Sequence, residues 1–262
     1  MITVFYHMYC LGDYRDRFER TITKIKSSGL YNNIIRIDIT IMAIGVGNRA
    51  TLKPTDRYRV NKQQAINQGD VNVDQVVNWL TDLVGDKLKY TIYNDYPELT
   101  EVQKIGGELV TLDRLYNYCK NDKNVEYILY LHSKGVTNPS PPVNSWVDYM
   151  EYFNIEKWEK MVCLLETGNN TAGCQFLDIK RECLHYSGNF WWARADWVIT
   201  RPVPDPVNCT LDRHKHNPRA YSEFWITDVP KKHPHTNTFV NVHIEHIDMY
   251  ENVLEKTRYR EQ

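Results

Sequence analysis

Branched apolar segments that alternate with amphipathic segments are the feature that most restricts the fold of this chain. Residues Ile2–Tyr6 are typical of a strand, Asp13–Ser28 carries apolar side chains at helical spacing, and Asn33–Ile44 is a second, isoleucine-rich strand. A nearly continuous apolar strand is typical of a parallel sheet covered on both faces. The pattern predicts an α/β fold built from strand–helix–strand units.

The alternation continues through the middle of the chain. Val73–Val84 and Leu112–Cys119 have helical spacing, whereas Lys89–Tyr93 and Val125–Leu131 are typical of strands. The polar residues Gly45–Val71 predict a long loop, of a kind that is often functional in compact domains. Ligands of parallel sheets bind beyond the carboxyl ends of the strands, so we look for the site there.

The second half of the chain predicts shorter elements. Val143–Leu165 is typical of one or two amphipathic helices, Ala172–Ile179 and His185–Ala193 of strands, and Asp196–Thr200 of a short helix or turn. No shift in composition calls for a second domain, so residues 1–262 are predicted to form one.

Charge and cysteine usage exclude several classes of protein. The chain has 32 basic and 33 acidic side chains and a net charge of −1, which argues against a nucleic-acid-binding protein. Its 6 cysteines are scattered without a metal or redox spacing, so a reducing compartment is expected. The N-terminal residues do not resemble a signal peptide, and no apolar run is long enough to span a membrane. These features predict a soluble cytoplasmic protein.

Four residues follow the strand Val125–Leu131 at the expected ligand edge: His132, Ser133, Lys134 and Gly135. A lysine there offers a compact positive charge to phosphate oxygens, and the histidine and serine add hydrogen-bond donors. The glycine lets the backbone approach a bulky ligand. Such a site would stabilise a departing nucleoside diphosphate. The alternative is a solvated surface turn.

A second segment combines small polar residues with two tryptophans. As a strand it would place Ser187, Asn189 and Trp191 on one face, which would suit the hydroxyls and the apolar patch of a sugar. The candidate sugar-binding residues are His185, Ser187, Gly188, Asn189, Trp191 and Trp192. The alternative is a buried strand anchored by both tryptophans.

The third candidate is Glu223, which lies in the segment Tyr221–Ile226. A carboxylate flanked by apolar residues can have a raised pKa and act as a general base. The alternative is an ordinary acidic residue in the first turn of a helix, favoured there by the helix dipole.

Together, His132–Gly135, Ser187–Ala193 and Ser222–Trp225 resemble a group of GT-A-type glycosyltransferases. Members of this group occur in large DNA viruses such as chloroviruses and in microbial polysaccharide clusters. The group is distantly similar to rhamnan-synthesis glycosyltransferases. The motifs of the resemblance lie within residues 125–226.

The resemblance implies a GT-A-like fold, with a mostly parallel sheet flanked by helices. Residues 1–135 would form the nucleotide-sugar-binding half and residues 136–262 the acceptor-binding and catalytic half. The implied reaction moves a sugar from a nucleotide diphosphate donor, a UDP-sugar being favoured, to a hydroxyl of an oligosaccharide or glycoprotein glycan. A viral member would act in the host cytoplasm. Xylose, rhamnose, glucose and galactose all stay open as the sugar.

The resemblance also implies roles for single residues. Glu223 aligns with the general base of inverting GT-A enzymes, which takes the proton of the acceptor hydroxyl. By its position, Tyr9 would contact the nucleobase, and Asn94 and Asp95 the ribose or the donor sugar.

His132 and Lys134 stand where many GT-A enzymes carry an Asp-x-Asp motif that holds a divalent metal. Lysine cannot ligate a metal as a cation, so its charge would replace that of the ion and the enzyme would be metal-independent. A site for Mn²⁺ or Mg²⁺ stays open as an alternative. Its ligands would come from His132, His185, His243, His246 and Asp95.

Two other functions also stay open. The same site could hydrolyse a nucleotide sugar with water as the acceptor. A lectin-like module could instead bind glycans on the tryptophan-rich segment without any turnover.

Overall fold

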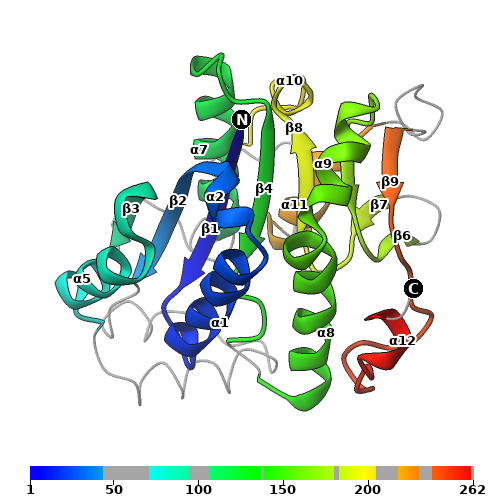
Figure 1. The fold of residues 1–262 in the computed structure, drawn as a ribbon, viewed down its shortest axis with the longest axis horizontal. Helices are drawn as coiled ribbons and strands as arrows, with labels where there is room; N and C mark the ends of the chain where they lie inside the picture. The colour runs from blue at the N-terminus through cyan, green and yellow to red at the C-terminus, as the bar shows by residue number, and fades with distance from the viewer. Residues whose placement is uncertain are drawn as a thin grey trace.

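A computed structural model of the chain describes residues 1–43, 71–94, 107–136, 139–179, 183–204, 218–229 and 238–260. Its centre is a seven-stranded sheet with the strand order β3-β2-β1-β4-β8-β5-β9 (Figure 1). Neighbouring strands are parallel except at β8, which runs antiparallel to both β4 and β5. The α/β fold with a mostly parallel sheet and flanking helices is therefore confirmed.

The elements of the first half alternate along the chain as the sequence predicts. They are β1 (Ile2–Tyr9), α1 (Tyr14–Ser27), α2 (Leu30–Asn33), β2 (Ile34–Ala43), α5 (Val73–Val84), η2 (Gly85–Lys87), β3 (Leu88–Asn94), α7 (Gly107–Asn121) and β4 (Tyr127–His132). Most of the predicted loop Gly45–Val71 lies outside the described residues.

The second half contributes shorter strands to the same sheet. Its elements are α8 (Pro141–Glu151), the π-helical turn η3 (Tyr152–Glu156), α9 (Trp158–Glu166), β5 (Thr171–Gly173), β6 (Phe176–Ile179), β7 (Cys183–Tyr186), β8 (Trp191–Arg194), α10 (Ala195–Val198), α11 (Pro218–Phe224), η4 (Trp225–Thr227), β9 (Phe239–Asn241) and α12 (Thr257–Arg260). Strands β6 and β7 pair with each other as a separate antiparallel hairpin.

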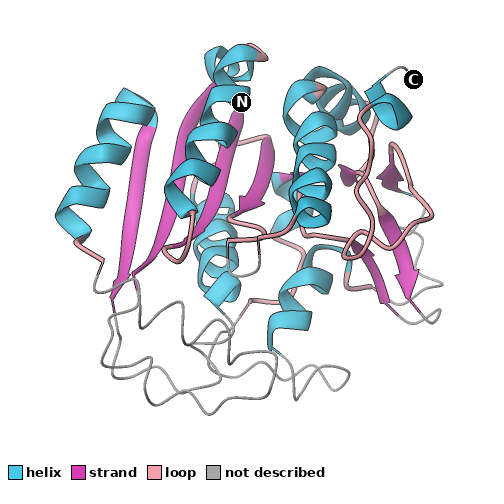
Figure 2. Cartoon of the chain, turned by 90° about the horizontal axis from the view of Figure 1, so that it is seen from below, coloured by secondary structure: helices cyan, strands magenta, loops and turns pink. Residues whose placement is uncertain are grey.

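Helices cover both faces of the sheet (Figure 2). Because side chains alternate along a strand, Leu129 and Leu131 of β4 face α1, α5 and α8, while Ile128 and Tyr130 face α7, α10 and α11. Each face encloses its own cluster of buried apolar side chains. This two-sided burial explains the continuous apolar runs of the inner strands.

Two of the predicted strands are wrong in extent. The segment Ala172–Ile179 divides between β5 and β6, and His185–Ala193 divides between β7 and β8. The second break is a turn in which Gly188 and Asn189 have positive φ angles of 91° and 58°. Neither conformation continues a strand. A glycine followed by asparagine is a turn signal that the alternation of side chains concealed.

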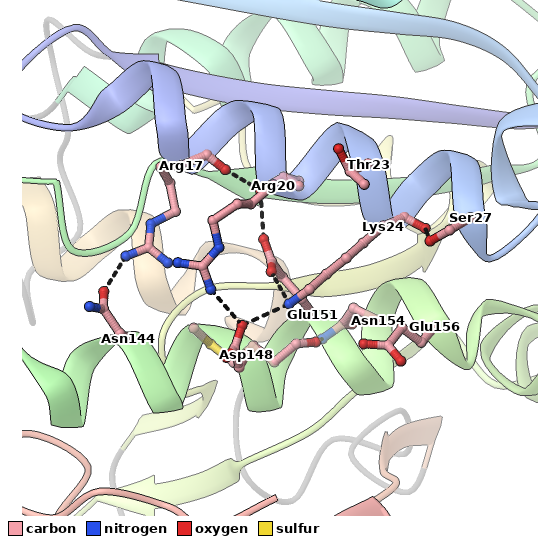
Figure 3. Close-up of polar contacts among 12 residues, drawn as sticks. Arg17, Arg20, Thr23, Lys24, Ser27, Asn144, Asp148, Glu151, Asn154 and Glu156 are labelled. Carbon is pink, nitrogen blue, oxygen red and sulfur yellow. Dashed lines mark hydrogen bonds and ion pairs between the residues drawn. The ribbon is translucent and has the colours of Figure 1, made fainter.

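A network of charges joins α1 to α8 on one face of the sheet (Figure 3). Lys24 donates to Glu151 at 2.7 Å and to Asp148 at 2.8 Å. Arg20 donates to Asp148 at 3.0 Å, and Thr21 donates to Glu151 at 2.6 Å. The carboxylate of Glu151 is buried, so the paired lysine and threonine compensate for its lost hydration. This network fixes the helix that follows β1 against the helix that follows β4.

Candidate functional site

The ends of β1 and β4 lie side by side at the carboxyl edge of the sheet. His7 pairs with His132 in the parallel register of the two strands. Beyond that pair, the backbone N–H of Tyr9 donates to the Ser133 hydroxyl at 2.8 Å, and the Ser133 N–H donates to the carbonyl of His7 at 3.0 Å. Ser133 therefore connects the two strand ends.

Lys134 is buried directly after this connection, with 7% of its surface exposed. Its ammonium lies 4.2 Å from the centre of the Trp146 ring on α8 and 5.6 Å from the centre of the Tyr250 ring. Within the described parts of the chain, no carboxylate forms an ion pair with it. Aromatic faces attract a cation and leave its charge uncancelled. The site can therefore attract an anion.

The backbone conformation and the packing around position 135 both require glycine. Its φ of 85° lies in the left-handed region, and an added Cβ atom would come within 2.7 Å of Val143. The glycine thus lets the chain turn from β4 towards α8 after placing Lys134. The structure gives this packing reason for Gly135, and a role in ligand approach remains a prediction.

The turn between β7 and β8 packs against the end of β4. An added Cβ atom at Gly188 would come within 2.3 Å of the Met150 sulfur, so only glycine fits there. The Gly188 carbonyl lies 2.8 Å from His132 Nε2, and Asn189, the next residue of the turn, is buried. The structure therefore brings the second sequence motif into contact with the first.

Glu108 is a central residue of the site that the sequence analysis missed. It lies in the first turn of α7, and its Oε2 accepts hydrogen bonds from Asn189 Nδ2 at 2.7 Å and from the Tyr130 hydroxyl at 3.1 Å. Its Oε1 lies 3.8 Å from His132 Nδ1. The predicted helix Leu112–Cys119 did not include Glu108, whereas α7 begins at Gly107.

The protonation of His132 follows from its contacts. The Gly188 carbonyl can only accept a hydrogen bond, so the nearby Nε2 carries a proton. Burial lowers the pKa of His132 and Lys134 also lowers it, while Glu108 and Glu223 act in the opposite direction; the net pKa is lowered. A neutral His132 therefore presents an unprotonated Nδ1 towards Glu108.

Glu223 lies on a helix that packs against the helix of Glu108. It lies on α11, a helix that packs against α7 and β7, and its side chain is partly exposed. Its charge and that of Lys134 both act on the His132 imidazole. His185 of β7 is buried, and its ring lies 4.9 Å from the ring of Phe224, which is on α11.

Trp191 and Trp192 belong to the core. Both side chains have 0% of their surface exposed. The Trp191 ring stacks on Tyr130 at 5.0 Å and donates its N–H to Asn189, while the Trp192 N–H donates to the Asn154 carbonyl. In this arrangement neither ring has a surface on which a sugar could stack. They support the turn that contains Gly188 and Asn189, and the alternative interpretation of a buried anchored strand describes them.

His7 lies beside His132 on the neighbouring strand β1. Its Nδ1 lies 2.8 Å from the Thr111 hydroxyl of α7. Burial lowers the pKa of His7 to about 4, an effect that Glu108 partly opposes and His132 reinforces. His7 is therefore uncharged at neutral pH.

The remaining predicted residues lie apart or cannot be placed. Asn94 ends β3, two strands away from β1, and Asp95 lies outside the described residues. His243 forms a hydrogen bond of 3.0 Å with Tyr149 of α8. No three histidine, cysteine or acidic side chains gather as metal ligands in the part of the chain that the structure describes.

A cavity of about 420 Å³ opens near the same sheet edge. It is lined by the first turns of α1 and α5 and by the residues just before them, including Asp13, Arg15 and Gln75. Because α1 follows β1, this cavity lies beyond the end of β1, past Tyr9.

Residues 48–234 match the family DUF8361, a domain of unknown function. The match covers more than half of the 262 residues, so the chain belongs to this family. It includes His132–Gly135, the β7–β8 turn and Glu223. No curated protein and no solved structure matched the chain.

Among the described helices, none combines the length and the apolar character that crossing a bilayer requires.

Proposed function

We propose that this protein is a GT-A-type glycosyltransferase that uses a nucleoside diphosphate sugar, favouring a UDP-sugar, and a hydroxyl of a glycan as acceptor. The observation that carries the proposal is Lys134, a buried cation at a strand end that aromatic rings hold in place of a carboxylate. A diphosphate leaving group is an anion that would complete such a site.

The proposed reaction is a single displacement with inversion. Glu223 takes the proton of the acceptor hydroxyl, whose oxygen forms a bond to the anomeric carbon of the donor sugar. The bond from that carbon to the diphosphate oxygen breaks, and its electron pair leaves with the diphosphate. Lys134 stabilises the negative charge that develops there. In this scheme the lysine takes the electrostatic part that a divalent metal has in other members of the class.

Further support comes from the layout of the sheet edge. The cavity beyond β1 offers room for a nucleoside beside the end of the strand that pairs with β4. The mostly parallel sheet is compatible with the GT-A-like fold that the sequence resemblance implies. The lectin-like alternative depended on exposed tryptophans and loses its support, because Trp191 and Trp192 are buried.

Calorimetric binding of uridine diphosphate (UDP) tests the role of Lys134. Lys134→Met should weaken UDP binding by at least about tenfold, since it removes the positive charge and keeps most of the apolar stem. Titrations with Mn²⁺ and with EDTA show whether a metal contributes. If Lys134→Met binds UDP as tightly as the wild type does, the proposal is wrong.

The role of Glu223 is tested by turnover in the presence of UDP-sugars and a glycan panel. Glu223→Gln should reduce transfer by roughly 10²-fold or more and should leave UDP affinity unchanged, because a general base acts in the reaction and not in donor binding. Equal rates for the variant and the wild type would contradict this role. Release of free sugar without any dependence on an acceptor would instead indicate a hydrolase.

A further inference from the structure

Tyr250 is an exposed aromatic ring beside the buried Lys134. The centre of its ring lies 5.6 Å from the Lys134 ammonium and 5.0 Å from the centre of the Trp146 ring, with the two ring planes at 81°. Trp146 has only 2% of its surface exposed, whereas Tyr250 has 58% exposed. Of the two rings around this lysine, Trp146 therefore belongs to the protein interior, and Tyr250 offers a surface to a ligand.

The turn that carries Tyr250 is held in place by hydrogen bonds. The N–H of Tyr250 donates to Asp248 Oδ1 at 2.8 Å, and the N–H of Asn252 donates to the Asp248 carbonyl at 2.9 Å. The N–H of Leu254, a buried residue, donates to the hydroxyl of Ser145 on α8 at 2.9 Å. The turn is thus attached to the same helix that carries Trp146. A ring that the protein already holds in position loses little entropy when a ligand stacks on it.

The exposed residues of this turn combine an apolar face with polar neighbours. Asp248, Glu251 and Asn252 are all exposed beside Tyr250. A pyranose ring also combines an apolar C–H face with hydroxyl groups around it, so its face can stack on the tyrosine while carboxylate and amide oxygens accept from the hydroxyls. The apolar surface of a partner protein would instead deprive these polar groups of water without replacing it.

We propose that Tyr250 is a stacking platform for a pyranose ring of the substrates. This inference rests on the proposed function, in which Lys134 binds the diphosphate. In the proposed transfer, the groups that follow the diphosphate on the side away from the nucleoside are the donor sugar and then the acceptor sugar. Both rings share the chemistry that the platform recognises, and the experiment below distinguishes them.

The layout of the sheet edge agrees with this order of groups. The cavity that offers room for the nucleoside lies at the first turns of α1 and α5, and Gly12 in its wall packs against the carbonyl of Val136, two residues after Lys134. Tyr250 belongs to the segment that follows α8 in space and leads to α12. In Figure 1, α5, α1, α8 and this segment succeed one another across the molecule. The order cavity, Lys134, Tyr250 thus matches the order nucleoside, diphosphate, sugar.

Two substitutions of Tyr250 and one matched control test the platform. Tyr250→Ala removes the ring, whereas Tyr250→Phe keeps it and removes only the hydroxyl. Tyr90→Ala is the control, because Tyr90 is a tyrosine with 43% of its surface exposed on β3, three strands away from β4. Thermal unfolding of the three variants shows whether they are folded.

Calorimetry with UDP, UDP-glucose, UDP-galactose, UDP-xylose and UDP-rhamnose is combined with acceptor kinetics on a glycan panel. Tyr250→Ala should bind UDP within about threefold of the wild type, because Trp146, the nearer ring, still lies against Lys134. If the donor sugar stacks on Tyr250, the variant should lose at least about fivefold in affinity for the preferred UDP-sugar. If the acceptor sugar stacks there, that affinity should persist and the KM for the acceptor should rise at least about fivefold.

The other variants and two further outcomes decide the interpretation. Tyr250→Phe and Tyr90→Ala should match the wild type in all these measurements. Equal losses for UDP and the UDP-sugars in Tyr250→Ala would mean that the ring only supports Lys134, and would overturn the platform. Unchanged affinities and an unchanged acceptor KM would overturn it as well.

Saturation-transfer NMR separates the platform from the proposed function. Saturation of the aromatic protons of the protein should reach the C–H protons of free glucose, galactose, xylose or rhamnose in the wild type and in Tyr250→Phe, and should weaken strongly in Tyr250→Ala. If this pattern appears and no nucleotide binds, the platform stands and the nucleotide-sugar reaction fails. If UDP binding depends on Lys134 but the transfer to every sugar is the same with and without the Tyr250 ring, the platform is wrong and the proposed function stands.

Discussion

Lys24 and Lys134 show two ways in which this fold treats a lysine with little exposure to solvent. Lys24 lies between α1 and α8 and is bonded to the carboxylates of Asp148 and Glu151. Lys134 is bounded by the rings of Trp146 and Tyr250, and no described carboxylate pairs with it. The first arrangement neutralises charge inside the protein, whereas the second preserves it. A charge that the protein itself does not neutralise is the better indicator of a ligand site.

The largest effect expected from this comparison concerns stability at Lys24. Lys24→Met would leave the buried carboxylate of Glu151 without its ammonium partner, and we expect a loss of roughly 3 kcal/mol in the free energy of unfolding. Urea unfolding at neutral pH measures it. UDP affinity should stay within about twofold of the wild type, because the network is remote from the proposed ligand. A variant that is as stable as the wild type would show that the network does not hold α1 to α8.

A second prediction uses pH to test whether His7, near the end of β1, is held neutral in the folded protein. His7 has a pKa of about 4 in the folded protein and roughly 6.5 when unfolded. Between these values only the unfolded chain takes up the proton, so the stability that is present above the unfolded pKa is lost as pH falls towards the folded one. The loss should reach roughly 3 kcal/mol.

The variant His7→Asn isolates this contribution, because an amide can keep a hydrogen bond to Thr111 and does not titrate in this range. Urea unfolding of both proteins between neutral pH and pH 4 should show a shallower acid dependence for the variant. Identical slopes would mean that His7 is not held neutral.

The smallest stability effect is expected at Lys134 itself. Lys134→Met should change the free energy of unfolding by less than about 1 kcal/mol, because the cation–π attraction that is lost is offset by the desolvation cost that is removed. Urea unfolding and UDP titration of both variants test the contrast. Lys24→Met should lose stability and keep its UDP affinity, whereas Lys134→Met should keep its stability and lose UDP affinity. If Lys134→Met destabilises the protein as much as Lys24→Met does, the contrast between the two lysines disappears.

The sequence predicted the elements of the parallel half of the fold well, as β2 and α5 show. Strand β2 and helix α5 lie within a residue or so of the predicted segments, since apolar spacing reports directly which side chains face a core. The second half was harder. Strands β7 and β8 looked like one strand, because alternation of side chains does not reveal a turn made by two residues with positive φ.

The candidate site was predicted in part. The fold brings the end of β4, with His132 and Lys134, into contact with the turn that contains Gly188 and Asn189. The helix of Glu223 packs against the helix of Glu108. Trp191 and Trp192 suggested a sugar platform, because a tryptophan in a strand carries no sign of whether its face meets a ligand or a core. Glu108 does not belong to any of the motifs that the sequence suggested. Its importance comes from Tyr130, His132 and Asn189, which meet it only in three dimensions.

The sequence by itself determined the strand–helix alternation, and with it a mostly parallel sheet. It also determined that Lys134 follows strand β4 at the carboxyl edge of that sheet. Local periodicity is enough for that, because burial on both sides of a strand leaves a regular mark along the chain. Only the tertiary structure decided which polar groups lose their charge or their exposure. That outcome depends on distant segments: Trp146 and Tyr250 cover Lys134, and the β7–β8 turn fixes the proton of His132. Hydrogen bonding and desolvation act over a few ångströms, and the spacing of residues in a sequence does not report such distances.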